Sequence, residues 1–121
     1  MNNRILMEKL QYLWNKKCTG EESVRITTQV SAIRNAFGIS IDDIESNEPI
    51  KDFDRKRVLS YFEIEKKMKD YFVKGVEYGN EHNDEKQKWD SMLRMLYYID
   101  AVRFFDEGMA DLLKNIAYQY I

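Results

Sequence analysis

The segment Trp89–Phe105, WDSMLRMLYYIDAVRFF, decides how this chain is expected to fold. Its apolar residues recur at steps of three and four, which places them along one face of a helix. This face consists of Trp89, Met92, Leu96, Ile99 and Val102. Further apolar side chains cover the adjoining flank, so neighbouring elements have to pack around the helix. We therefore predict a central helix over about residues 84–105, with Asp84 and Gln87 as a capping box at its start.

Length and composition are typical of a small globular protein. A chain of 121 residues with 44% hydrophobic and 33% charged residues fits a single domain with one core, residues 1–121. The net charge of −2 argues against a general attraction to nucleic acid or anionic membranes. The single cysteine, Cys18, excludes an intramolecular disulfide and suits a reducing compartment. No signal-peptide or transmembrane pattern is found, so we expect a cytoplasmic protein.

The N-terminal half is predicted to contain two helices. The first begins near Asn3 and buries Leu6, Leu10, Leu13 and Trp14. The second spans Glu21–Phe37, starts with a capping box of Thr19 and Glu22, and ends at Gly38, where a left-handed residue is favourable. The first half of this helix is rich in β-branched residues, so an extended conformation of that part is the alternative. The buried stripe of this helix consists of Ile26, Val30, Ile33 and Phe37.

A short turn, IDDIE, capped by Ser40, connects this pair to the rest of the chain. The loop at residues 46–50 contains the only proline, Pro49, and is the place for a hinge between an N-terminal helical pair and a C-terminal helical bundle. A third helix is predicted to begin at Asp52 or Asp54. Gly75, within this helix, marks a point where another helix crosses closely.

The C-terminal segment allows two interpretations. The helix breaks or kinks near Gly108, or the same apolar rhythm continues to Tyr120 and gives a helix about 55 Å long. We favour a break, and the apolar character of this segment favours a homodimer in either case. Because strand alternation is weak throughout, the fold class is all-α, a small bundle of four to six helices around the central helix.

No catalytic or cofactor-binding constellation is found in the sequence. The only histidine, His82, lies in a polar turn near three acidic residues, a pattern more typical of a solvated turn than of a metal site. A nucleophile with a neighbouring base and a glycine-rich phosphate loop are both missing. We therefore expect a protein that is not an enzyme and holds no cofactor or metal.

Two charged surfaces are candidates for binding. The acidic one surrounds the proline loop and would suit a basic partner; it consists of Asp42, Asp43, Glu45 and Glu48. The basic one follows the start of the third helix and would contact phosphates; it consists of Arg55, Lys56, Arg57, Lys66, Lys67 and Lys69.

One segment also has a familiar pattern. The residues IRNAFGISIDDIESNEPI, 33–50, resemble the end of a phage-repressor-type helix-turn-helix domain, where a helix ends in a small-apolar-Gly-apolar-Ser sequence before an acidic turn. The preceding helices lack the usual Gln at the start of the scanning helix. The resemblance therefore implies a common way of joining two helices and adds only slightly to the case for DNA binding.

The surplus of aromatic and methionine residues indicates a protein interface. Our first hypothesis is a non-enzymatic protein-binding module that acts by occupying a partner surface, such as an inhibitor, an immunity or antidefence factor or an accessory subunit, including those carried by phages or mobile elements. Its interface would combine the acidic loop with the C-terminal residues Met109, Leu113, Tyr118 and Tyr120. The alternative is a nucleic-acid-binding regulator, or a small helical subunit of a nucleoprotein complex, that uses the basic surface.

Overall fold

The computed structural model describes residues 3–16, 20–45 and 56–120, and within these ranges the chain forms six helices and no strand. The first three are α1 (Asn3–Asn15), α2 (Glu21–Phe37) and α3 (Ile41–Glu45). The fourth is continuous and consists of α4 (Tyr61–Met68), a π-helical turn η1 (Lys69–Val73) and α5 (Lys74–Glu81). The last two are α6 (Glu85–Arg103) and α7 (Glu107–Tyr118). This confirms the all-α prediction.

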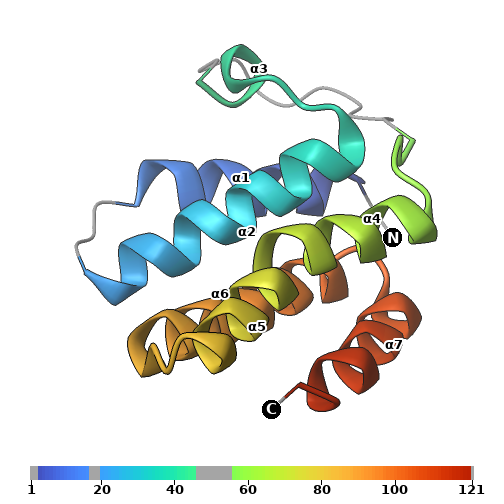
Figure 1. Cartoon of the computed structure of the whole chain (residues 1–121). Helices are drawn as coiled ribbons and strands as arrows, with labels where there is room; N and C mark the ends of the chain where they lie inside the picture. Colours follow the sequence, from blue (N-terminus) through green and yellow to red (C-terminus); the bar gives the residue numbers. More distant parts are fainter. Residues whose placement is uncertain (1–2, 17–19, 46–55, 121) are drawn as a thin grey trace.

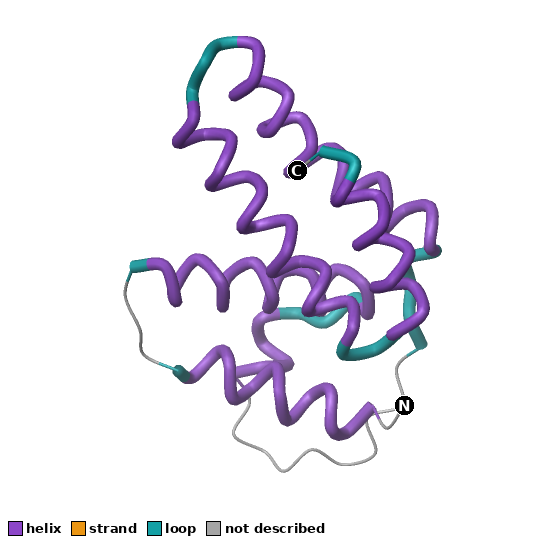
Figure 2. The backbone as a smooth tube through the Cα atoms, turned by 90° about the horizontal axis from the view of Figure 1, so that it is seen from below, coloured by secondary structure: helices purple, strands orange, loops and turns teal. Residues whose placement is uncertain are grey.

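The helices pack around α6, as predicted for the central segment. α6 contacts α2, η1, α5 and α7, whereas α1 packs on α2 and α3 (Figure 1). The view from below shows α5 and α6 as an antiparallel pair joined by a short turn, with α2 crossing them (Figure 2). One core cluster contains residues from α1, α2, α3, the α4–α5 helix, α6 and α7.

The buried face of α6 differs from the predicted one. Met92, Ile99 and Val102 are buried as expected, but Trp89 is 58% exposed and Leu96 only partly buried. The buried stripe is centred on the fully buried Met95. Trp89 stands six positions earlier and therefore lies about 120° away from Met95 around the helix axis. The placement of Trp89 in the core was therefore wrong. The other tryptophan, Trp14, is partly buried and packs against the core.

The ends of α2 lie where the sequence predicted them. The helix spans Glu21–Phe37, its four predicted stripe residues are buried, and Gly38 adopts the left-handed conformation with φ 64°. Ile39 supplies the buried apolar contact after it, and its N–H donates to Arg34 O at 3.0 Å. The N-cap residue is Gly20, without a side-chain cap; Thr19 lies outside the described residues.

The start of the third helix was wrongly predicted. Residues 56–59 are not helical, and α4 begins at Tyr61. A capping box fixes this start, because the Glu63 N–H donates to Ser60 Oγ at 3.2 Å and the Ser60 N–H donates to Glu63 Oε1 at 3.4 Å. The predicted starts at Asp52 and Asp54 and the predicted hinge at 46–50 all lie outside the described residues.

The close helix crossing predicted at Gly75 is confirmed. A Cβ atom added there would lie 2.1 Å from Ser91 Oγ, and one added at Gly79 would lie 2.8 Å from the Asp84 carbonyl oxygen. These two glycines let the backbones of α5 and α6 approach closely at the α5–α6 turn. The Asp84 side chain caps α6 by accepting a hydrogen bond from the Gln87 N–H at 3.1 Å.

The C-terminal segment breaks, as we favoured. α6 ends at Arg103, and Asp106 is the N-cap of α7, where its Oδ1 accepts from the Met109 N–H at 3.0 Å. Gly108 therefore lies inside the first turn of α7 and not at the break itself. The second Asp106 carboxylate oxygen pairs with Arg57 at 2.9 Å, which ties the start of α7 to the segment before α4.

Candidate functional site

The structure describes the side chains of only two residues of the predicted acidic surface, Asp42 and Asp43. Asp43 is used to cap α3, because its N–H donates to Ser40 Oγ at 3.1 Å and its carboxylate accepts from the Ser40 N–H at 3.2 Å. Asp42 is exposed. The side chain of Glu45 and all of Glu48 lie outside the described part of the chain. Of this surface the structure therefore shows a single free carboxylate, that of Asp42.

Two of the predicted basic residues pair with carboxylates of their own helix. Lys66 pairs with Asp70 at 2.6 Å, and this hydrogen bond raises the pKa of Lys66 and lowers the pKa of Asp70. Lys69 pairs with Glu65 at 3.5 Å, and Lys67 lies over the Tyr71 ring at 5.7 Å.

At the other end of this surface, Arg57 is held by Asp106, Lys56 is exposed, and Arg55 lies outside the described residues. A phosphate would have to compete with carboxylates for Arg57, Lys66 and Lys69. The contacts therefore lend no support to the nucleic-acid alternative.

The predicted C-terminal interface is only partly on the surface. Met109 is 5% exposed and Leu113 is fully buried, so both belong to the chain's own core and are removed from the interface. Tyr120 is partly buried against the same core, whereas Tyr118 is 56% exposed. The apolar stripe that suggested a partner surface is satisfied within the chain. The homodimer stays a prediction.

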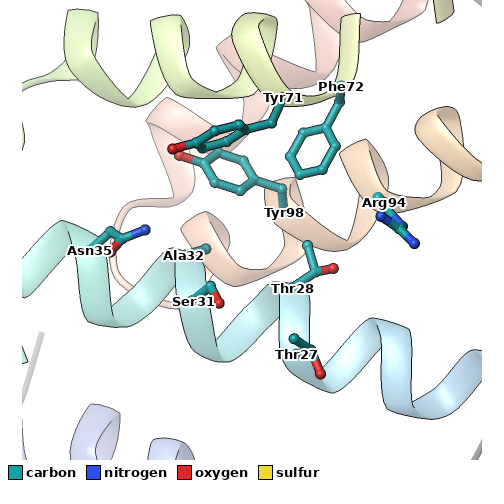
Figure 3. A pocket seen from close by; sticks show the side chains of 9 residues that line it. All are labelled: Thr27, Thr28, Ser31, Ala32, Asn35, Tyr71, Phe72, Arg94 and Tyr98. Carbon is teal, nitrogen blue, oxygen red and sulfur yellow. The ribbon is translucent and has the colours of Figure 1, made fainter. Parts of the chain in front are cut away.

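The structure shows a groove that the sequence did not reveal, between α2, η1 and α6, with a volume of about 340 Å³ (Figure 3). η1 contributes Tyr71 and Phe72, and α6 contributes Arg94 and Tyr98. The side of the groove formed by α2 consists of Thr27, Thr28, Ser31, Ala32 and Asn35. The groove thus joins segments that lie far apart in the sequence, and its lining mixes hydroxyl groups with aromatic rings.

Aromatic packing holds the η1 side of the groove in place. The Phe72 ring packs against Tyr98 with 5.6 Å between centroids, and Tyr71 meets Phe72 edge-on at 6.1 Å. The Tyr98 hydroxyl donates to the carbonyl oxygen of Ile64 at 3.3 Å. Tyr71 is 58% exposed, and its hydroxyl lies beside that of Tyr98 (Figure 3). The π-helical turn changes the register of the helix here, because its hydrogen bonds close one residue later than those of an α-helix.

Most polar groups of the groove are not used within the chain. Thr28 donates its hydroxyl to the Val24 carbonyl oxygen at 2.8 Å. In the described part of the chain, no hydrogen bond or ion pair is formed by the side chains of Thr27, Ser31, Asn35 and Arg94. Arg94 is also the only charged residue of the lining. The groove therefore offers a cation and several hydrogen-bonding groups to a ligand.

A partial signal for this site was present in the sequence. Thr27, Ser31 and Asn35 recur at steps of four, which puts them on one face of α2 beside its buried stripe. Thr27 also belongs to the β-branched run at residues 24–30, which had left an extended start of α2 open. The opposite wall could not be identified, since nothing local in KDYFV distinguishes a π-helical turn from an α-helical one.

Burial of Tyr98 predicts a loss of stability at high pH. Desolvation, with a smaller contribution from Tyr71, raises the pKa of Tyr98 well above its usual value. The unfolded chain therefore releases this proton from about pH 10 upward while the folded chain keeps it, so stability is complete below pH 10 and falls as pH rises. Between pH 9 and 11 we expect wild type to lose about 1.4 kcal/mol more than Tyr98→Phe in urea unfolding.

The matched control for this experiment is Tyr118→Phe, which removes an exposed phenol from α7. This variant retains Tyr98 and should follow the wild-type pH dependence. Equal pH dependence of wild type and Tyr98→Phe would contradict the buried environment of this phenol.

Comparisons with known proteins add no assignment: no family model, no curated protein and no solved structure matches this chain. Among the described residues, no group of three or more His, Cys, Asp or Glu side chains is arranged to hold a metal ion. No described helix has both the length and the apolar character that crossing a membrane requires. The groove between α2, η1 and α6 is the candidate functional site.

Proposed function

We propose that this chain is a non-enzymatic protein-binding module that acts by occupying a partner surface, as an inhibitor or an accessory subunit does. Its contact face is the groove between α2, η1 and α6. The observation that supports this is that Tyr71 and Arg94 line the same groove. Tyr71 is 58% exposed, and the side chain of Arg94 forms no hydrogen bond or ion pair in the described part of the chain. Tyrosine and arginine are the residues in which binding hot spots are enriched.

The composition of this face favours a protein partner. Tyrosine gives a large, rigid contact area, while serine, threonine and asparagine provide adaptable hydrogen bonds. Both kinds of residue line the groove, with Tyr71 on one wall and Thr27, Ser31 and Asn35 on the other. The α7 face is a weaker candidate, because Met109 and Leu113 are already buried in the core.

Affinity capture from the source cell tests this proposal. The tagged wild-type protein should retain one protein in stoichiometric amount, and the double variant Tyr71→Ala, Arg94→Ala should retain at least tenfold less. Tyr118→Ala is the matched control, since Tyr118 is 56% exposed, close to the value of Tyr71, but lies on α7. It should capture as much partner as wild type.

The other outcomes are equally informative. Loss of capture with Tyr118→Ala alone would move the interface to α7. Equal capture by all three proteins would reject the groove as the contact face, and the absence of any stoichiometric partner would reject the function. Far-UV circular dichroism of each variant checks that the helices are intact.

A further inference from the structure

We propose that the groove between α2, η1 and α6 recognises a carboxylate next to an aromatic or aliphatic side chain, presented by an acidic segment of the partner protein. Arg94 would bind the carboxylate, and the apolar side chain would lie against Phe72 and Ala32. This inference rests on the proposed protein-binding function and specifies the chemistry of the partner.

The state of Arg94 supports an anionic group as its ligand. The other arginines with described side chains are all engaged: Arg25 with Glu22, Arg57 with Asp106, Arg103 with Asp111, and Arg34 with the Ile39 carbonyl oxygen. Arg94 makes no such contact with any described residue, although Asp90 stands one turn earlier on the same helix. The chain has more acidic residues (21) than basic ones (19), yet Arg94 pairs with none of the described carboxylates. Its guanidinium is therefore available to bind a carboxylate of another molecule.

The layout of the groove indicates what accompanies the carboxylate. Figure 3 shows Arg94 at one end, with its guanidinium on the side away from the aromatic rings, and the hydroxyls of Tyr71 and Tyr98 with Asn35 at the other end. Between them lie Phe72, Ala32, Thr28 and Ser31. A ligand that spans the groove therefore meets a cation, then the apolar surface of Phe72 and Ala32 with the hydroxyls of Thr28 and Ser31 beside it, and then the hydrogen-bonding groups at the far end. A short peptide segment has this order when an acidic residue stands next to an apolar one and a backbone amide follows.

The size of the groove agrees with a peptide segment. Its volume of about 340 Å³ is at the lower end of the range for ligand sites, which is about 300–1,000 Å³. That space accommodates a few side chains and not a large cofactor. A guanidinium that binds a carboxylate through two parallel hydrogen bonds also gives this contact a defined direction.

Titration of the ¹⁵N-labelled protein with defined probes tests the inference by NMR. The probes are acetyl-Asp-Phe-amide and acetyl-Phe-Asp-amide, their asparagine counterparts, and free 3-phenylpropionate. At least one acidic dipeptide should give saturable shifts at Thr28, Phe72 and Arg94, and the asparagine counterparts should give none. In Arg94→Gln the affinity for the acidic dipeptide should fall at least tenfold.

Arg103→Gln is the matched control, because Arg103 lies on the same helix but is paired with Asp111 at 2.9 Å, outside the groove. This variant should bind the dipeptide as wild type does. Equal binding of acidic and neutral dipeptides, no saturable shift with any probe, or unchanged affinity in Arg94→Gln would each overturn the inference. Binding of 3-phenylpropionate without either dipeptide would also overturn it, in favour of a small-molecule ligand.

The two proposals fail separately. If Arg94 and Tyr71 are needed for partner capture but no acidic probe binds, the carboxylate assignment is wrong and the protein-binding function stands. If an acidic dipeptide binds through Arg94 but no partner is captured from the cell, the groove chemistry is right and the proposed function is wrong.

Discussion

Replacement of Leu113 by alanine is expected to lower the free energy of unfolding by about 3 kcal/mol, within the range of about 2–5 kcal/mol for leucines truncated in a core. Leu113 is fully buried in the core cluster that α7 shares with the other helices. Removing its branched end leaves a cavity that the rigid neighbours fill only in part. Urea denaturation followed by circular dichroism measures the difference.

The neighbouring residue provides the control. Leu112 has the same side chain on the same helix but is 53% exposed, so Leu112→Ala should change stability by about 0.5 kcal/mol or less. If both substitutions are nearly neutral, α7 is not docked on the core as described. A larger loss for Leu112→Ala than for Leu113→Ala would mean that α7 presents a different face to the bundle.

Replacement of Gly79 by alanine is expected to cost about 2 kcal/mol. An added Cβ would lie 2.8 Å from three atoms of the α6 start: the Asp84 carbonyl oxygen, the Lys88 nitrogen and the Lys88 Cβ. Two of these are backbone atoms, which cannot rotate away, so the α5–α6 pair has to separate. Overpacking of this kind costs about 1–3 kcal/mol, and the better helix propensity of alanine offsets it only in part.

Gly108→Ala is the matched control, because the added methyl group at this position meets no close contact. The nearest atom to an added Cβ there is 3.8 Å away, and the residue lies within the first turn of α7. Stability should therefore be unchanged or rise by up to about 1 kcal/mol. Thermal unfolding of both variants measures the contrast. Similar melting temperatures would show that α5 and α6 do not approach as closely as described.

The sequence was most informative where a structure depends on a few neighbouring residues. The C-terminal end of α2 with the left-handed Gly38, the cap of α6 at Asp84 and the close approach at Gly75 were all predicted from residue chemistry. The start of α4 was missed although its signal was equally local. We chose acidic residues earlier in the chain and overlooked the capping box of Ser60 and Glu63.

The surfaces were harder to predict, because they depend on how whole helices face one another. An apolar stripe has the same pattern whether it covers the chain's own core or a partner, and Met109 and Leu113 cover the core. Trp89 was placed in the core because the predicted buried face of α6 was counted from Trp89, whereas the observed face is centred on Met95. The basic cluster was counted without the carboxylates that pair with Lys66 and Lys69.

The number of residues in the π-helical turn η1 (Lys69–Val73) determines which side chains of this helix face the groove. Each residue of an α-helix advances the chain by about 100° around the axis. The π-helical turn holds one residue more than an α-helical turn, so deleting one residue here would restore a regular α-helix, keep Ile64 and Val76 on either side in place, and move Tyr71 out of its position in the groove. A related chain could thus alter what this groove accepts by a single insertion or deletion and leave its hydrophobic interior intact.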